Sequence, residues 1–313
     1  MASIEELVAE LNGQLAAMAL PSTEGPKHFV LKIGRDKNGW FYALFDDPRQ
    51  TSTVPMSIEE LLALEQQDTV LTSVHLSDDP TYGFELTRCS REDLVEKLAP
   101  FIAARTQPST SLWVNGHREV ILAAVDMFRA PFAFGDLFIG YEGQESDDFL
   151  VTQLQNNPGI RHLRLMSPWP QSEALEDVLF KHLTSGVLEV FSMERLQRHD
   201  RSSMRFTYGM FRQVFGAWSS AETDKAFKFE GPGGGLSGVT VEDVLSMPYP
   251  EEMARVEDNM TSFFVNMIVV AWTKPNGWHL EFRLNCSDDD VTLSSSGCPR
   301  RLPTACPQFS WFF

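Results

Sequence analysis

The sequence predicts an α/β fold built from stacked strand–helix units, and three observations support this. Short segments of alternating apolar residues recur about every 25 residues, a period typical of stacked units. A helical pattern of apolar residues follows each segment, and an Asn-Gly turn lies between two β-type segments near each end of the chain. The leading leucines of the four recurring segments are Leu112, Leu137, Leu163 and Leu188.

The strands of the predicted sheet are apolar on one face only. Strands covered on both faces read as continuous apolar runs, whereas Leu112 and Val114 and their counterparts alternate with polar and aromatic residues. Helices are therefore expected on one side of a parallel sheet, as in an irregular leucine-rich-repeat-like solenoid. If the strands stay in register, the open side carries a row made of Trp113, Phe138, Arg164 and Glu189.

This open face is the predicted binding surface, because exposed aromatic residues, arginine and methionine are enriched at the centres of protein interfaces. The alternative is that a terminal segment of the chain covers the aromatic residues. An ion pair between His162 and Asp136 is also expected there, and it would raise the pKa of the histidine. The residues predicted to bind a partner are Trp113, Phe138, Arg164, Glu189, Asp136, His162, Met166 and Phe191.

The first 89 residues are expected to precede the array. Apolar residues at helical spacing predict an amphipathic helix within residues 1–20. Residues 27–89 are expected to form an N-terminal hairpin and capping region, with a hairpin turn at Asn38-Gly39 and a capping box from Ser57 to Glu60 that begins a helix. The expected strands of this region are 29–34, 40–45, 70–76 and 82–88, and the last has the spacing of a first repeat unit.

Residues 90–230 are the predicted repeat array. Ser90 and Asp93 have the spacing of a capping box at its first helix, and the wider spacing before the last strand implies an insertion at 194–203. The later helices are expected at 117–128, 146–155, 172–183 and 204–218, and the last strand at 225–230.

The C-terminal part repeats the opening arrangement. A glycine-rich loop at 231–238 leads to a helix and a second Asn-Gly hairpin within residues 239–284. Terminal units of a repeat array cover the exposed end of its core, so hairpins at both ends fit capping roles. Residues 285–313 are rich in serine, aspartate and proline and are expected to form a mobile tail.

An acidic composition limits the partners. The 313 residues include 26 Lys and Arg against 43 Asp and Glu, which gives a net charge of −17. Binding to phosphate backbones depends on Lys and Arg, so nucleic acid and anionic membranes are disfavoured, whereas a basic protein would be attracted. Sparse cysteines, no apolar run of ~20 residues and no targeting segment indicate a protein of the cytoplasm or nucleus.

No motif indicates catalysis, a cofactor or a metal. Residues 231–238 lack the Gly-Lys-Ser/Thr of a phosphate-binding loop, and Gly235-Leu-Ser237-Gly-Val departs from a nucleophile elbow at its last position. Asp288-Asp-Asp290 lacks the spaced ligands of a calcium loop, and the histidines show no metalloprotease spacing. No catalytic, cofactor-binding or metal-binding residue is therefore predicted.

Several stretches resemble a large uncharacterised group of nematode proteins. They are Leu163-Arg-Leu-Met-Ser-Pro-Trp-Pro170, the Asn-Gly-Trp turns and Val269-Val-Ala-Trp-Thr273, and the resemblance covers most of 28–284. Some members of the group are similar to F-box proteins with a leucine-rich-like array, which implies an interaction or adaptor role. An F-box needs a three-helix unit longer than the segment before Pro21, so the resemblance gives no expectation of ubiquitin-ligase assembly.

These observations predict a non-catalytic protein-interaction scaffold or adaptor that binds a protein partner on the open sheet face. The alternative is an enzyme whose site is assembled from loops and carries no motif. A sealed pocket with convergent polar groups would favour the enzyme, and an open surface would favour the scaffold.

Overall fold

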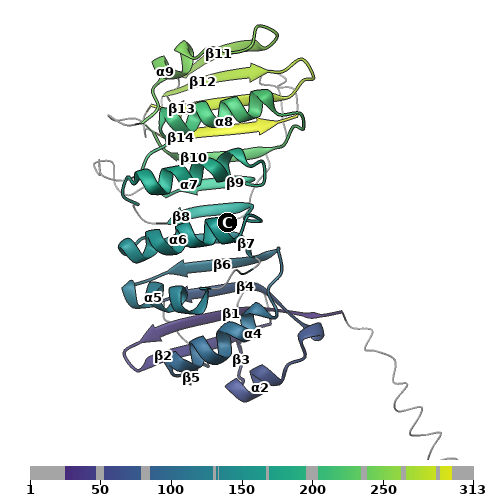
Figure 1. Cartoon of the computed structure of the whole chain (residues 1–313), viewed down its shortest axis with the longest axis vertical. Helices are drawn as coiled ribbons and strands as arrows, with labels where there is room; N and C mark the ends of the chain where they lie inside the picture. Colours follow the sequence, from purple (N-terminus) through teal and green to yellow (C-terminus); the bar gives the residue numbers. More distant parts are fainter. Residues whose placement is uncertain are drawn as a thin grey trace, which may run out of the picture.

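One open mixed sheet dominates the computed structural model of the chain, which describes residues 25–46, 53–78, 85–129, 132, 134–166, 169–194, 204–233, 238–261, 266–286 and 290–297. The described residues form fourteen strands in the order β11-β12-β13-β14-β10-β9-β8-β7-β6-β4-β1-β2-β3, and β5 pairs with β2. The strands are stacked along the long axis of the molecule, and the helices lie on one side of them (Figure 1). The predicted α/β class is confirmed.

The centre of the sheet is parallel and its ends are antiparallel. β1, β4, β6, β7, β8, β9 and β10 form the parallel part, so it begins before residue 90, where the array was expected to start. Its strands are β1 (Lys27–Asp36), β4 (Thr69–Ser77), β6 (Thr110–Asn115), β7 (Phe134–Gly140), β8 (His162–Met166), β9 (Val190–Met193) and β10 (Phe227–Pro232).

Antiparallel strands flank this part on both sides. The two predicted Asn-Gly hairpins are confirmed, because β1 pairs with β2 and β12 pairs with β13 in antiparallel register. The antiparallel strands are β2 (Gly39–Phe45), β3 (Thr53–Val54), β5 (Thr87–Cys89), β11 (Ala254–Thr261), β12 (Asn266–Thr273), β13 (His279–Asn285) and β14 (Asp290–Ser296).

Several helices begin at a side-chain cap. Ser57, Ser90 and Thr240 each form both hydrogen bonds of a capping box with the residue three positions later, and Ser172 caps its helix through Leu175 N–H. The helical segments are α2 (Ile58–Ala63), η1 (Gln66–Asp68), α3 (Arg91–Asp93), η2 (Leu94–Leu98), α4 (Ala99–Ala103), α5 (Arg118–Met127), α6 (Gln144–Asn156), α7 (Glu173–Thr184), α8 (Tyr208–Ser220) and α9 (Val241–Ser246).

The main core lies between these helices and the sheet. The strand leucines Leu112, Leu137 and Leu163 are paired across neighbouring strands and are almost fully buried against the helices. β6, β7 and β8 therefore bury the face that their alternating leucines and valines predict.

The prediction of a mobile tail over residues 285–313 is wrong for Asp290–Ser296, which form β14. Asp290–Ser296 pairs with both β13 and β10, so it joins the C-terminal hairpin to the parallel part. Val291 and Leu293 are fully buried in the core, and their alternation with Thr and Ser is a strand period that the polar composition concealed. The glycine-rich loop is also shorter than predicted, since Gly231 and Pro232 belong to β10.

The predicted first repeat strand at 82–88 is also in a different place. Its described part contributes to β5, which pairs antiparallel with β2, while β4 takes the place beside β6. Leu86 packs against Val30, Ala43 and Phe45 on the sheet face opposite the helices. It therefore belongs to a small separate cluster and does not pack into the core of the array. The helix predicted within residues 1–20 lies outside the described residues, as does most of the insertion at 194–203.

On the face opposite the helices, several described residues are buried near each end, whereas those in the centre stay partly exposed. Val30 and Phe45 are buried at one end of it, and Val269 and Glu281 are buried at the other. Between them, outward residues of β4, β6, β7, β8 and β9 keep part of their surface exposed. We call this central region the open face. Among the described residues, no helix combines the length and the apolar composition needed to cross a bilayer.

Candidate functional site

An aromatic row crosses the open face. Trp113 of β6 lies directly beside Phe138 of β7, and Phe138 lies beside Arg164 of β8, as the strand spacing predicted. The Trp113 and Phe138 rings are stacked, with centroids 3.8 Å apart and planes 8° from parallel. Both residues are partly exposed. Neighbouring strands therefore hold two flat rings side by side, with their edges directed away from the sheet.

His75 extends this row, and the sequence prediction missed it. It belongs to β4, pairs with Trp113 and stacks on the indole with centroids 5.5 Å apart. Burial, with a smaller effect of Lys32, lowers the pKa of His75 to about 4, so the ring is neutral near pH 7. Both faces of Trp113 are thus covered by neighbouring rings, and a partner would meet the ring edges.

Glu189 does not occupy the predicted place beside Arg164. β9 begins at Val190, and Leu163 pairs with Phe191 instead of with Leu188, so Ser192 lies beside Arg164. The residue aligned with Leu163 is thus three positions later than predicted, and a shift by an odd number of residues exchanges the two faces of a strand. Glu194, at the other end of β9, pairs with Arg164 at 2.8 Å.

The same shift removes Phe191 from the predicted binding surface. Phe191 is fully buried in the main core and lies against Phe229 of β10. Met166 lies beside Gly140 and is 7% exposed, so it offers little surface to a partner. These two predicted contact residues are therefore replaced by His75 and Glu194 at the exposed surface.

His162 and Asp136 form the expected pair. Their side chains occupy neighbouring positions on β8 and β7, with 3.0 Å between His162 Nδ1 and Asp136 Oδ1. Ser111 Oγ donates a hydrogen bond of 2.8 Å to the other carboxylate oxygen. Glu189, although displaced from its predicted row, approaches the second imidazole nitrogen, with 3.7 Å from His162 Nε2 to Glu189 Oε2.

These contacts change the pKa values of both partners. The hydrogen bond to Asp136 raises the pKa of His162, aided by the charges of Asp136 and Glu189 and opposed by burial and Arg161. Burial alone would raise the pKa of Asp136, but hydrogen bonds from His162 and Ser111 outweigh it and lower that pKa. The pair is therefore stabilised in its ionised form. We refer to His75, Trp113, Phe138, Arg164, Asp136 and His162 as the open-face patch.

The patch does not have the geometry of a nucleophilic site. Activation of a serine requires its hydroxyl to bond the imidazole that accepts its proton, whereas Ser111 donates to Asp136. Among the described residues, no group of three or more His, Cys, Asp or Glu side chains is arranged to hold a metal ion. The arrangement is suited to polar and apolar contacts on an exposed surface.

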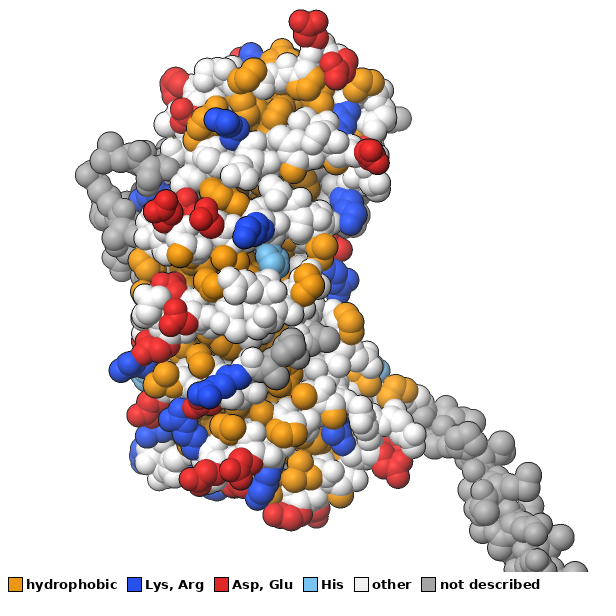
Figure 2. Space-filling model, viewed as in Figure 1, with side chains coloured by type: hydrophobic (Ala, Val, Ile, Leu, Met, Phe, Trp, Pro, Cys, Tyr) orange, Lys and Arg blue, Asp and Glu red, His pale blue; other side chains and the backbone are white. Residues whose placement is uncertain are grey.

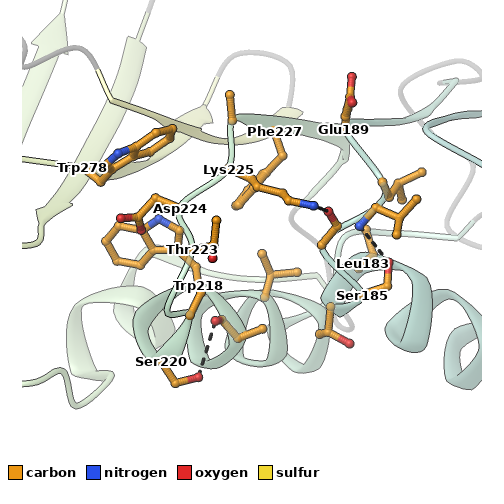
Figure 3. Close-up of a pocket in the computed structure, with 18 of the residues that line it drawn as sticks. Leu183, Ser185, Glu189, Trp218, Ser220, Thr223, Asp224, Lys225, Phe227 and Trp278 are labelled. Carbon is orange, nitrogen blue, oxygen red and sulfur yellow. Dashed lines mark hydrogen bonds between the residues drawn. The ribbon is translucent and has the colours of Figure 1, made fainter.

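A pocket of about 950 Å³ lies next to the patch, between the turns that precede β9 and β10. Trp218, Phe227 and Trp278 form part of its wall, and Lys225 Nζ reaches the Gly186 carbonyl oxygen at 2.8 Å (Figure 3). Asp224 is engaged by Lys274 and by Asn276, each at 2.6 Å. These polar groups serve contacts within the chain, and Glu189 both lines the pocket and lies near His162 of the patch.

Comparison with known proteins found no matching family model, no matching curated protein and no matching solved structure.

Proposed function

We propose that the chain is a non-catalytic protein-interaction scaffold, an irregular leucine-rich-repeat-like solenoid that binds a protein partner on its open face. The observation that supports this function is the partly exposed row of Trp113, Phe138 and Arg164 in the centre of a sheet face that none of the described helices covers. Tryptophan and arginine are the residue types that most often dominate the binding energy of protein interfaces.

The rigidity of the patch favours the same function. Each of its residues is held by a strand of the sheet, and the stacked rings restrict one another. A surface that is already ordered loses little conformational entropy when a partner binds. The adjoining pocket favours the scaffold over the enzyme alternative, because its buried ion pair and Lys225 are engaged within the chain.

Affinity purification with paired variants tests the function. We expect Trp113→Ala and Arg164→Glu each to weaken binding of the recovered partner by about thirtyfold, the effect of a central interface residue. Arg118→Glu is the matched control, because Arg118 is also an exposed arginine paired with a glutamate but lies on α5, on the helix-covered side.

The recovered partner is then cross-linked to the wild-type chain, and the linked residues are identified by mass spectrometry. Cross-links next to β6–β9 on the open face are expected. Partners that bind equally well to both open-face variants, or that cross-link only to the helices, would show that the function is assigned to the wrong surface. Thermal unfolding of each variant checks that lost binding does not reflect lost folding.

A further inference from the structure

Three carboxylates lie beside the aromatic row, each next to a basic side chain of the open-face patch. Asp136 and Glu189 lie on one side of the row, and Glu194 lies at the far end of β9 with Arg164. Of these carboxylates Glu189 is the most accessible, with 52% of its side chain exposed. The helix-covered side also carries positive and negative side chains intermixed (Figure 2).

His162 is the internal counter-ion of this carboxylate group. Its two ring nitrogens face Asp136 on β7 and Glu189 before β9, at 3.0 and 3.7 Å. The other charged groups near it are Arg161 on its own segment and Lys228, which follows Val190 in the same row and is paired with Glu230. A protonated imidazole donates from both nitrogens, whereas a neutral imidazole has one N–H and cannot satisfy two carboxylates.

We infer that the partner docks through an arginine- or lysine-rich segment with apolar anchors, and that its cationic side chain competes with the protonated His162 for Glu189. This inference rests on the proposed docking function and names the partner of the same surface. Apolar side chains of the segment contact the edges of Trp113 and Phe138, and its cation takes the accessible carboxylate. The net charge of −17 attracts such a segment from solution.

The competition fixes the direction of the pH dependence. Below the raised pKa of His162 the imidazolium holds Glu189, so the partner's cation gains less from binding. Above it the neutral ring releases one carboxylate, and the same cation binds more tightly. Affinity for a basic segment therefore increases as the pH rises through the pKa of His162, and arginine stays charged throughout this range.

A fluorescent peptide of alternating arginine and leucine is the probe, and its acidic counterpart has glutamate in place of each arginine. We expect the basic peptide to bind the wild-type chain, with affinity falling about two- to fivefold between about pH 8 and about pH 5.5, the size of one exposed ion pair. Glu189→Gln is expected to weaken binding by a similar factor and to remove the pH dependence. His162→Gln is expected to retain binding without the pH dependence.

A double substitution provides the matched control for charge. Glu92→Gln with Glu96→Gln removes two exposed carboxylates from the α3–η2 helical segment on the covered side, and we expect it to leave the pH dependence intact. An unchanged pH dependence in Glu189→Gln, or tighter binding at low pH, would overturn the inference. If Trp113→Ala weakens both peptides while Glu189→Gln weakens neither, the docking function stands and only the basic partner is refuted. If Trp113→Ala affects neither peptide, both proposals fail on this surface.

Discussion

At the scale of single residues, His162 of β8 contacts two carboxylates, that of Asp136 on β7 and that of Glu189 before β9. Its contact with Asp136 is the closest and most shielded, and its contact with Glu189 is longer and more exposed. Because its folded-state pKa is raised, protonated His162 contributes stability that is fully present below the unfolded pKa. That contribution is lost as the pH rises through the folded pKa. The partner's proposed pH dependence and the chain's own pH dependence therefore have opposite directions.

Replacing Asp136 tests the origin of this shift. We expect Asp136→Asn to lower the pKa of His162, because the largest influence that raises it is the hydrogen bond to this carboxylate. The measurement is an NMR titration of the imidazole protons. Glu189→Gln is expected to lower the pKa less, since its oxygen is farther from the ring and more exposed to solvent. An unchanged His162 pKa in Asp136→Asn would show that the pair does not form in solution.

At the scale of elements, the sequence predicted residues side by side on neighbouring strands correctly where the connections between strands have nearly constant length. Trp113, Phe138 and Arg164 are in register because the connections before β7 and β8 keep a nearly constant length. The prediction for Glu189 fails because the whole unit from β8 to β9 is longer: Leu163 pairs with Phe191, 28 residues later, whereas Leu137 pairs with Leu163, 26 residues later. Leu188 still packs into the core. His75 was missed because the segment containing β5 lies between β4 and the array, so His75 falls outside the period.

The repeat spacing of the sequence does not predict contacts between distant segments, and one ion pair is an example. Lys274, next to the β12–β13 turn, pairs with Asp224, in the connection from α8 to β10, at 2.6 Å. Their side chains are 7% and 9% exposed, and the Lys274 ammonium lies 4.9 Å from the centre of the Trp218 ring. No local spacing relates two residues so far apart in the sequence. The pair fixes the C-terminal hairpin to the last helix of the array.

Removing one member of this pair is expected to be costly. We predict that Lys274→Ala lowers the free energy of unfolding by about 3–5 kcal/mol, because it leaves the Asp224 charge buried without its partner. Urea unfolding followed by circular dichroism measures the change. Arg118→Ala, which breaks the exposed pair with Glu145, is the control and should cost about 1 kcal/mol or less. Equal losses in the two variants would mean that the Lys274 pair is solvated.

At the scale of the whole molecule, the sheet is open, and its two outer edge strands, β3 and β11, differ in the features that discourage pairing with other chains. β3 is two residues long, and β11 carries Arg255, Glu257 and Asp258. Short edge strands and charged edges both discourage pairing with other chains. The alternation of leucines predicted the parallel centre, but a strand as rich in serine as β14 gave too weak an apolar signal to predict how the C-terminal strands join it.

Two truncations test the importance of β14. Ending the chain after Asn285 removes the strand that pairs with both β10 and β13, so we expect aggregation and loss of a cooperative unfolding transition. Ending it after Gly297 keeps every pairing of β14 and should leave the transition in place. Thermal unfolding and light scattering distinguish the two. A cooperative monomer after truncation at Asn285 would contradict the role given to β14.

The position of β14 also has a consequence for synthesis on the ribosome. β10 emerges well before the strand that completes its pairing, because α9 and three further strands are translated in between. At about 5–20 residues per second, that interval lasts several seconds. During it the nascent chain presents an unpaired β10 edge and the apolar face that Val291 and Leu293 later cover. The growing polypeptide is thus most vulnerable to misassembly in the interval between the synthesis of β10 and that of β14.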